Sequence, residues 1–73
     1  AGRAVEDRAE LARVLAGLRQ LPEVERAALL LRTSHDLAYD EIGRLLGLTS
    51  VAARVKVHRA RRKLLELREG GTR

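Results

Sequence analysis

The sequence predicts an all-α domain of four helices that contains a helix-turn-helix, and three observations support this prediction. Four segments carry apolar residues at the spacing of an amphipathic helix. Proline, glycine and hydroxyl residues separate these segments, as is common at helix ends. The last two segments form a short helix, a glycine, a three-residue turn and a long capped helix, which is the layout of a helix-turn-helix. At 73 residues, the chain is long enough for a single domain over residues 1–73.

The first helix is expected from about Val5 to Leu18. Its apolar stripe consists of Leu11, Val14, Leu15 and Leu18. Gly17 and the Leu21-Pro22 pair should end it, because a residue before proline is pushed out of the helical region. Residues 1–4 are expected to be a linker or a cloning remnant, so we expect the chain to be a fragment of a longer protein.

The second helix is expected to begin at Pro22, whose missing N–H costs nothing at the first helical position. Glu23 and Glu25 complement the positive end of its dipole, and the polar residues 33–36 should end it. Its expected core stripe consists of Val24, Ala27, Ala28, Leu30 and Leu31.

The third helix is expected to be short, from Tyr39 to Leu46, and to end at Gly47 in the left-handed conformation. Three of its residues should point inward: Ile42, Leu45 and Leu46. Thr49 or Ser50 should then cap the fourth helix.

The fourth helix is expected to run to about Glu69, before a tail at residues 70–73. On a helical wheel its core side consists of Ala53, Val57, Ala60, Leu64 and Leu67. The opposite side carries Val51, Val55, His58 and Arg62, flanked by Arg54 and Arg59. The side of this helix that cannot be core therefore holds most of the basic residues.

Charge is distributed unevenly along the chain. The formal net charge is +5, but residues 1–41 contain six Lys/Arg against eight Asp/Glu, and residues 42–73 contain nine against two. A basic block on one element is typical of a protein that binds a polyanion. Tyr39 is the only aromatic residue, too few for the stacking surfaces that single-strand and RNA binders use. Duplex DNA is therefore the favoured ligand.

Several functional classes are excluded by composition. Cysteine is absent, so there is no disulfide or thiolate metal site, and a cytoplasmic location is expected. No apolar run approaches the roughly 18 residues of a membrane span, and the first residues do not form a secretory signal. His35, an expected loop residue, and His58 lack metal-ligand spacing. Neither a catalytic triad nor a glycine-rich phosphate loop is present, so we expect no enzyme, no cofactor and no small-molecule substrate.

Five motifs, in order and without a gap from about Leu21 to Leu67, resemble the C-terminal domain (region 4) of extracytoplasmic-function sigma factors of bacterial RNA polymerase. They are Leu21-Pro22-Glu23-Val24-Glu25-Arg26, Leu29-Leu30-Leu31-Arg32, Leu37-Ala38-Tyr39-Asp40-Glu41-Ile42, Leu46-Gly47-Leu48 and His58-Arg59-Ala60-Arg61-Arg62-Lys63-Leu64. The DNA-binding domains of response regulators are also four-helical, but they place the corresponding histidine closer to the isoleucine. Here His58 follows Ile42 by sixteen residues, which is the sigma spacing.

This resemblance implies that the domain reads the −35 promoter element in the major groove of double-stranded DNA, while an upstream domain reads the −10 region. By position it assigns base reading to Arg54, Val55, His58 and Arg59. Val51 is added to these residues, either as a contact to thymine methyl groups or as an ordinary exposed residue. Phosphate contacts are expected from Arg32, Tyr39, Thr49, Ser50, Lys56, Arg61 and Arg62.

Besides Val51, four of these residues have alternatives that the sequence leaves open. Val55 could be an ordinary exposed apolar residue, and His58 could belong to an inert surface. Tyr39 could instead pack at the start of the third helix, and Arg32 could be a plain surface charge. The partners that the resemblance implies are promoter DNA, the β flap of the RNA polymerase core and, in many members, an anti-sigma protein.

The chain departs from the family pattern at three places. Val51-Ala52-Ala53 replaces the usual Gly-Thr-Val at the start of the fourth helix, and Val55 replaces a serine. Both changes bear on the DNA sequence that is preferred. Ala38 replaces a serine cap and so breaks a capping box with Glu41, at a cost of about 0.5–2 kcal/mol in helix stability.

Two other functions remain open at this point: a free-standing helix-turn-helix regulator, and a protein-interaction domain that an anti-sigma partner binds. Binding of the β flap separates a sigma factor from a free-standing regulator. A steep salt dependence of duplex binding separates both DNA binders from an interaction domain.

Overall fold

A computed structural model describes the backbone of residues 2–71 and the side chains of residues 8–67. The chain forms four helices: α1 (Gly2–Gln20), α2 (Glu23–Ser34), α3 (Tyr39–Leu46) and α4 (Ser50–Gly71). The predicted all-α class with a helix-turn-helix is therefore confirmed. Both outer helices are longer than expected, because α1 begins before Val5 and α4 continues through the glycine pair. Ala1, Thr72 and Arg73, which were expected in the linker and the tail, lie outside the described residues.

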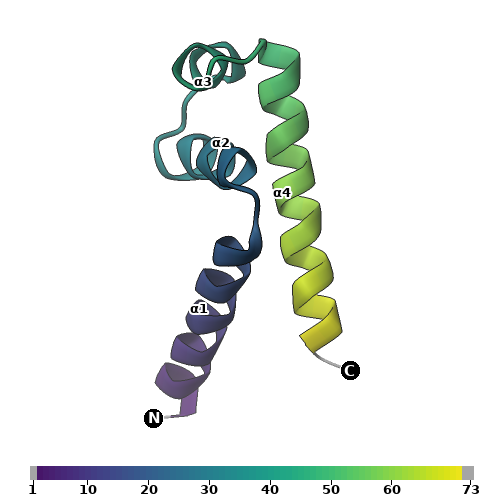
Figure 1. The fold of residues 1–73 in the computed structure, drawn as a ribbon. Helices are drawn as coiled ribbons and strands as arrows, with labels where there is room; N and C mark the ends of the chain where they lie inside the picture. The colour runs from purple at the N-terminus through teal and green to yellow at the C-terminus, as the bar shows by residue number, and fades with distance from the viewer. Residues whose placement is uncertain (1, 72–73) are drawn as a thin grey trace.

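The long helix α4 is the spine against which the other three pack (Figure 1). α2 and α3 lie on one side of its N-terminal half, and α1 lies beside its C-terminal half. The helical part of the molecule is elongated, with principal extents of 43 × 24 × 14 Å. One long side of α4 therefore has no other helix over it.

The core is small and lies where α2 and α3 meet α4. Its buried apolar residues are Leu21, Ala28, Leu29, Ile42, Ala53, Val57 and Ala60. Ile42 and Val57 are the largest fully buried side chains. Ala53 and Ala60 are also fully buried, and their short side chains let the backbones of the neighbouring helices approach α4 closely.

The buried stripe of α2 differs from the predicted one. Val24 and Leu30 were expected in the core, but both are exposed, and Leu29 is buried instead. The inward residues of α2 are Glu25, Ala28 and Leu29, which share one face at i, i+3 and i+4 spacing. The buried face of α2 is therefore rotated from the predicted one. The prediction missed this because it placed only apolar residues on the inner face, where the structure also has Glu25.

Apolar residues of α3 and α1 are also more exposed than predicted. Leu45 was expected to point inward but is 65% exposed, because α3 packs through the side that carries Ile42 and Leu46. On α1, only Leu18 of the predicted stripe packs against the core. Leu11, Val14 and Leu15 are exposed because α1 meets the rest of the molecule mainly along α4.

Gly17 does not end the first helix, which continues through it to Gln20. The residue is buried, and a Cβ atom there would lie 2.8 Å from Leu64 Cδ2. Gly17 therefore allows α1 to approach α4 closely, which is a packing role that the sequence prediction missed.

The turn between α3 and α4 is tight and well bonded. Gly47 has φ +71° and ends α3 in the left-handed conformation, as predicted. The N–H of Leu48 donates to the Gly43 carbonyl at 2.7 Å, and a Cβ atom on Gly43 would collide with the Leu48 carbonyl oxygen. The Thr49 hydroxyl accepts a hydrogen bond from the N–H of Ala52 at 3.0 Å, so Thr49 is the cap of α4.

Half of the capping box at the start of α3 survives. Ala38 has no side-chain acceptor, but its N–H donates to Glu41 Oε1 at 3.3 Å. The loss that the sequence predicted for Ala38 is therefore confined to one of the two capping bonds.

A cross-helix ion pair that the sequence analysis missed joins α2 to α4. Lys63 Nζ donates to Glu25 Oε2 at 2.8 Å, and Glu25 is only 5% exposed. Glu25 was assigned to the helix dipole alone. Its burial shows that it also fixes how α2 sits on α4, because a buried carboxylate requires its partner.

Replacement of Gly43 tests the close approach in the turn. Gly43→Ala should lower the free energy of unfolding by about 1–3 kcal/mol, because the new methyl group meets backbone that cannot rotate away. The matched control is Gly17→Ala, whose Cβ meets only the ends of the Leu64 and Leu67 side chains. These ends can shift at a small cost, which the gain of about 1 kcal/mol in helix propensity should offset. Urea denaturation monitored by circular dichroism measures both. Equal stabilities of the two variants would contradict the described turn.

Replacement of Lys63 tests this ion pair, in which Glu25 is buried and the Lys63 side chain is 44% exposed. Lys63→Met should lower the free energy of unfolding by about 1–3 kcal/mol, because it leaves the Glu25 carboxylate buried without a partner. Adding Glu25→Gln should recover part of this loss. The control is Arg62→Met, which breaks an exposed pair with Glu66 and should change the stability by less than about 1 kcal/mol. A loss in the control as large as that in Lys63→Met would refute the role of burial.

Candidate nucleic-acid interface

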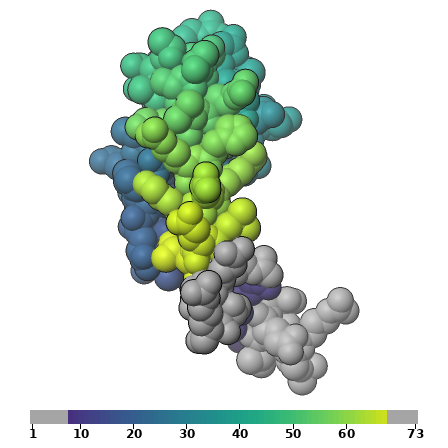
Figure 2. Space-filling view, turned by 90° about the vertical axis from the view of Figure 1, so that its right-hand side faces the viewer, coloured from purple at the N-terminus to yellow at the C-terminus, as the bar shows by residue number. Residues whose placement is uncertain are grey.

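The candidate interface is the side of α4 that turns away from α2 and α3, here called the basic face. Figure 2 looks onto this side, where side chains of α4 stand out from the surface. The basic face consists of Val51, Arg54, Val55, His58, Arg59 and Arg62, all of which are exposed. They include all five residues predicted to read bases.

Helical periodicity alone places these residues together. Ala53, Val57 and Ala60 are fully buried and occupy one side of α4, so residues about half a turn away must face outward. Thr49 fixes the start of the helix, and the Gly43–Leu48 turn fixes its entry angle. The base-reading candidates occupy the first three turns of α4, directly after this rigid turn. The basic face is thus held by packing and by hydrogen bonds rather than by a loop.

Two exposed valines lie among the charges of this face. Val51 is 71% exposed and Val55 is 39% exposed. Both positions differ from the family pattern, and neither side chain is part of the core. An apolar side chain here can contact a thymine methyl group in a DNA groove.

The N-terminus of α4 supplies the polar residues expected at phosphates. Thr49 and Ser50 are both exposed. The Thr49 oxygen already accepts from Ala52, but its O–H can still donate. Backbone N–H groups and hydroxyls at such a helix start are common phosphate ligands in protein–DNA complexes. The contacts themselves remain predictions.

The basic residues predicted to contact phosphates farther along α4 have different surroundings. Lys56 is half-buried, whereas Arg61 and Arg62 are exposed. Arg62 Nε lies 3.7 Å from Glu66 Oε1 in an exposed pair. Such pairs within one helix contribute about 0.3–0.5 kcal/mol, so a phosphate could replace the carboxylate at little cost. Arg61 lines a second surface feature of the molecule.

Arg32 and Tyr39 contact one another. Arg32 Nη1 donates to the Leu37 carbonyl at 3.0 Å, and its guanidinium carbon lies 4.9 Å from the centre of the Tyr39 ring. Tyr39 is half-buried and packs against the core, which was one of the two alternatives for this residue. Arg32 is half-buried as well, so it is not a plain surface charge. A phosphate contact by either residue remains a prediction.

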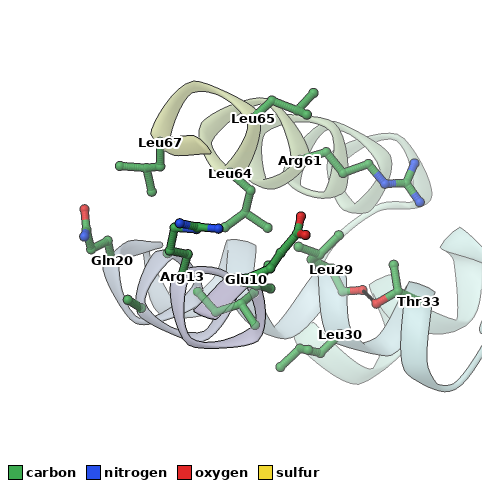
Figure 3. A pocket seen from close by; sticks show the side chains of 14 residues that line it. Glu10, Arg13, Gln20, Leu29, Leu30, Thr33, Arg61, Leu64, Leu65 and Leu67 are labelled. Carbon is green, nitrogen blue, oxygen red and sulfur yellow. Dashed lines mark hydrogen bonds between the residues drawn. The ribbon is translucent and has the colours of Figure 1, made fainter. Parts of the chain in front are cut away.

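The second surface feature is an apolar groove of about 640 Å³ between α1, α2 and α4. Figure 3 shows Leu64, Leu65 and Leu67 of α4 on one side of it, with α1 and α2 opposite. The charged side chains that line it are Glu10, Arg13 and Arg61. This apolar groove was not predicted, because the apolar stripe of α1 was assigned to the core. The sequence feature that could have indicated this groove is the apolar stripe of α1, because the core of so small a domain cannot bury all of it.

Within the described part of the chain, no cluster of three or more His, Cys, Asp or Glu residues is arranged to hold a metal ion. None of the helices there combines the length and the apolarity that crossing a membrane requires.

Comparison with known protein families gives one result. The chain matches the model of the family described as Sigma-70, region 4, from residue 11 to residue 64. Comparisons with curated proteins and with solved structures each give no significant match. The match covers all of α2 and α3, the turn and most of α4. The chain belongs to the region 4 family of sigma-70 factors, whose members are DNA-binding domains of transcription initiation rather than catalysts.

Proposed function

We propose that this domain reads the −35 element of promoter DNA with the basic face of α4, as region 4 of an extracytoplasmic-function sigma factor. The observation that carries the proposal is the exposure of all five base-reading candidates on one side of a rigidly held helix. No Asp or Glu occurs between Ile42 and Leu65, so nothing acidic on this stretch repels the phosphates. A cytoplasmic location, where promoter DNA is found, belongs to the same proposal.

In this proposal the first three turns of α4 enter the major groove, which is about 12 Å wide and admits a helix. Arg54 and Arg59 each carry the paired N–H donors that match the acceptor edge of guanine. Val51 and Val55 meet thymine methyl groups, so the preferred site should differ from that of family members with smaller or polar residues there. The surrounding phosphates are neutralised from the start of α4 and from Lys56, Arg61 and Arg62.

The proposed polymerase contact uses the apolar groove. The base-reading candidates lie in the N-terminal half of α4. The α4 residues that line the apolar groove are Arg61 and the leucines that follow it. DNA and a protein partner could therefore be bound at the same time. We propose that an apolar helix of the polymerase β flap occupies the apolar groove, with an acidic residue of that helix near Arg13. An anti-sigma protein would act by covering either surface.

Substitutions on the basic face separate base reading from phosphate binding. Arg54→Ala should cost about 1–3 kcal/mol in binding and relax the preference at one base pair. Lys56→Ala should weaken all duplexes alike and reduce the slope of log affinity against log salt by about 0.9. Titrations across salt concentrations, with a target duplex selected from a random library and with single-base variants of it, measure both.

The outcomes of these titrations decide between the candidate functions. An equal loss on every duplex for Arg54→Ala would make Arg54 a phosphate contact. A wild-type affinity that does not change with salt would exclude DNA reading and favour a protein-interaction domain.

A charge placed in the apolar groove tests the polymerase contact. Val14→Glu should reduce binding to the isolated β flap at least tenfold, because a carboxylate would be buried against an apolar helix. The same variant should bind duplex DNA as the wild type does. Leu45→Glu is the control, since Leu45 is also an exposed apolar residue but lies on α3 outside the groove. Wild-type protein that binds DNA but not the flap would favour a free-standing regulator.

A further inference from the structure

The short connection between α2 and α3 is held in one conformation. Asp36 adopts φ +51°, a left-handed backbone that aspartate tolerates better than most non-glycine residues and that reverses the chain direction here. The N–H of Leu37 donates to the Leu31 carbonyl at 3.2 Å. The chain therefore turns back onto the end of α2 before α3 begins.

One side chain spans this connection. Arg32 lies in the last turn of α2, and its Nη1 atom donates to the Leu37 carbonyl at 3.0 Å. Its guanidinium group also covers the ring of Tyr39, the first residue of α3, at 4.9 Å from the ring centre. Arg32 thus joins the end of one helix, the connection and the start of the next.

Tyr39 transmits this restraint toward the DNA-reading helix. Its ring packs against the buried core, so its place determines how the first turn of α3 sits. α3 has only eight residues and continues through the tight Gly43–Leu48 turn into α4. A change in the direction of α3 would therefore move the first turns of α4, where Val51 and Arg54 lie.

We infer that Arg32 is a positioning residue for DNA reading. It acts through Leu37 and Tyr39, by setting the orientation of α3 and of the start of α4, and not by contacting a phosphate. This inference rests on the proposed function. It replaces the role that the sequence resemblance implied for Arg32.

The chemistry of the side chain makes the two roles separable. The planar guanidinium both donates to the carbonyl and stacks on the ring, which a lysine ammonium on a flexible stem cannot do in the same geometry. A lysine does, however, keep the positive charge that a phosphate contact needs. Arg32→Lys and Arg32→Met therefore form a matched pair, of which only the first retains the charge.

The experiment measures binding of both variants to the selected target duplex and to an unrelated duplex over a range of salt concentrations. We expect each variant to lose about tenfold in affinity for the target, from the loss of one hydrogen bond and one cation–π contact. The loss on the unrelated duplex should be smaller. The salt slopes of the two variants should equal that of the wild type, since the charge at residue 32 does not touch a phosphate.

A double-mutant cycle with Tyr39→Leu tests whether Arg32 acts on DNA binding through the Tyr39 ring. In that background, Arg32→Met should reduce target affinity by clearly less than tenfold, because the stacking partner is already gone and only the hydrogen bond to the Leu37 carbonyl is lost. Arg44→Met is the control, because Arg44 is an exposed residue on α3 whose pair with Asp40 lies outside this contact. It should leave the discrimination between the two duplexes unchanged. Circular dichroism at the assay temperature confirms that each variant is folded, so a merely stabilising role would leave the affinities unaltered.

Three results would overturn the inference. Target affinity of Arg32→Lys close to that of wild type, with a salt slope about 0.9 lower in Arg32→Met alone, would make Arg32 a phosphate contact. Folded variants with unchanged discrimination would leave it only a structural role. Wild-type protein without salt-dependent duplex binding would refute the proposed function itself, and the positioning role with it.

Discussion

The structure depends on one constraint: one side of α4 must be buried in the core while the opposite side stays exposed. Ala53, Val57 and Ala60 satisfy the first demand, because they are fully buried and small enough for α2 and α3 to approach. The helical period then leaves the basic residues outside without any further device. The core is small partly because the exposed side of α4, the longest helix, contributes no residue to it.

A helix that must present a defined face has to be fixed in rotation as well as in place. Ala53, Val57 and Ala60 resist rotation of α4 because they are closely packed in the core. The bond from Lys63 to the buried Glu25 adds a polar contact between α2 and the middle of α4. An orientation that separated this pair would leave the Glu25 carboxylate buried without a partner. The Gly43–Leu48 turn fixes the start of α4.

The sequence predicted well most of what depends on the local helical period. The four helices, the left-handed Gly47 and the two faces of the N-terminal part of α4 follow from spacing within single segments. Glycine was a weaker guide to helix ends, because α1 continues through Gly17 and α4 through Gly70. Leu67 was predicted on the core side of α4 but is 40% exposed and lines the apolar groove. The sequence prediction failed where the outcome depends on a partner distant in the chain. Leu29 rather than Leu30 is buried because α2 turns Glu25 toward Lys63, and nothing local indicates a pair separated by 38 residues. The exposure of Leu45 and the apolar groove likewise depend on how much of α3 and α1 is covered.

The exposed apolar residues of α1 leave unused some of the stabilisation that apolar burial could give the folded domain. Leu11, Val14 and Leu15 are exposed to water, and Val14 lines the open apolar groove. A partner helix there would bury apolar surface that the domain cannot cover with its own residues, and any such binding stabilises the folded state. The rigid unit of α2, α3 and α4 can hold the basic face without that help, because its core does not include α1 beyond Leu18. The proposed DNA-reading face and the proposed docking groove thus occupy different parts of one small fold, and α4 is the element that they share.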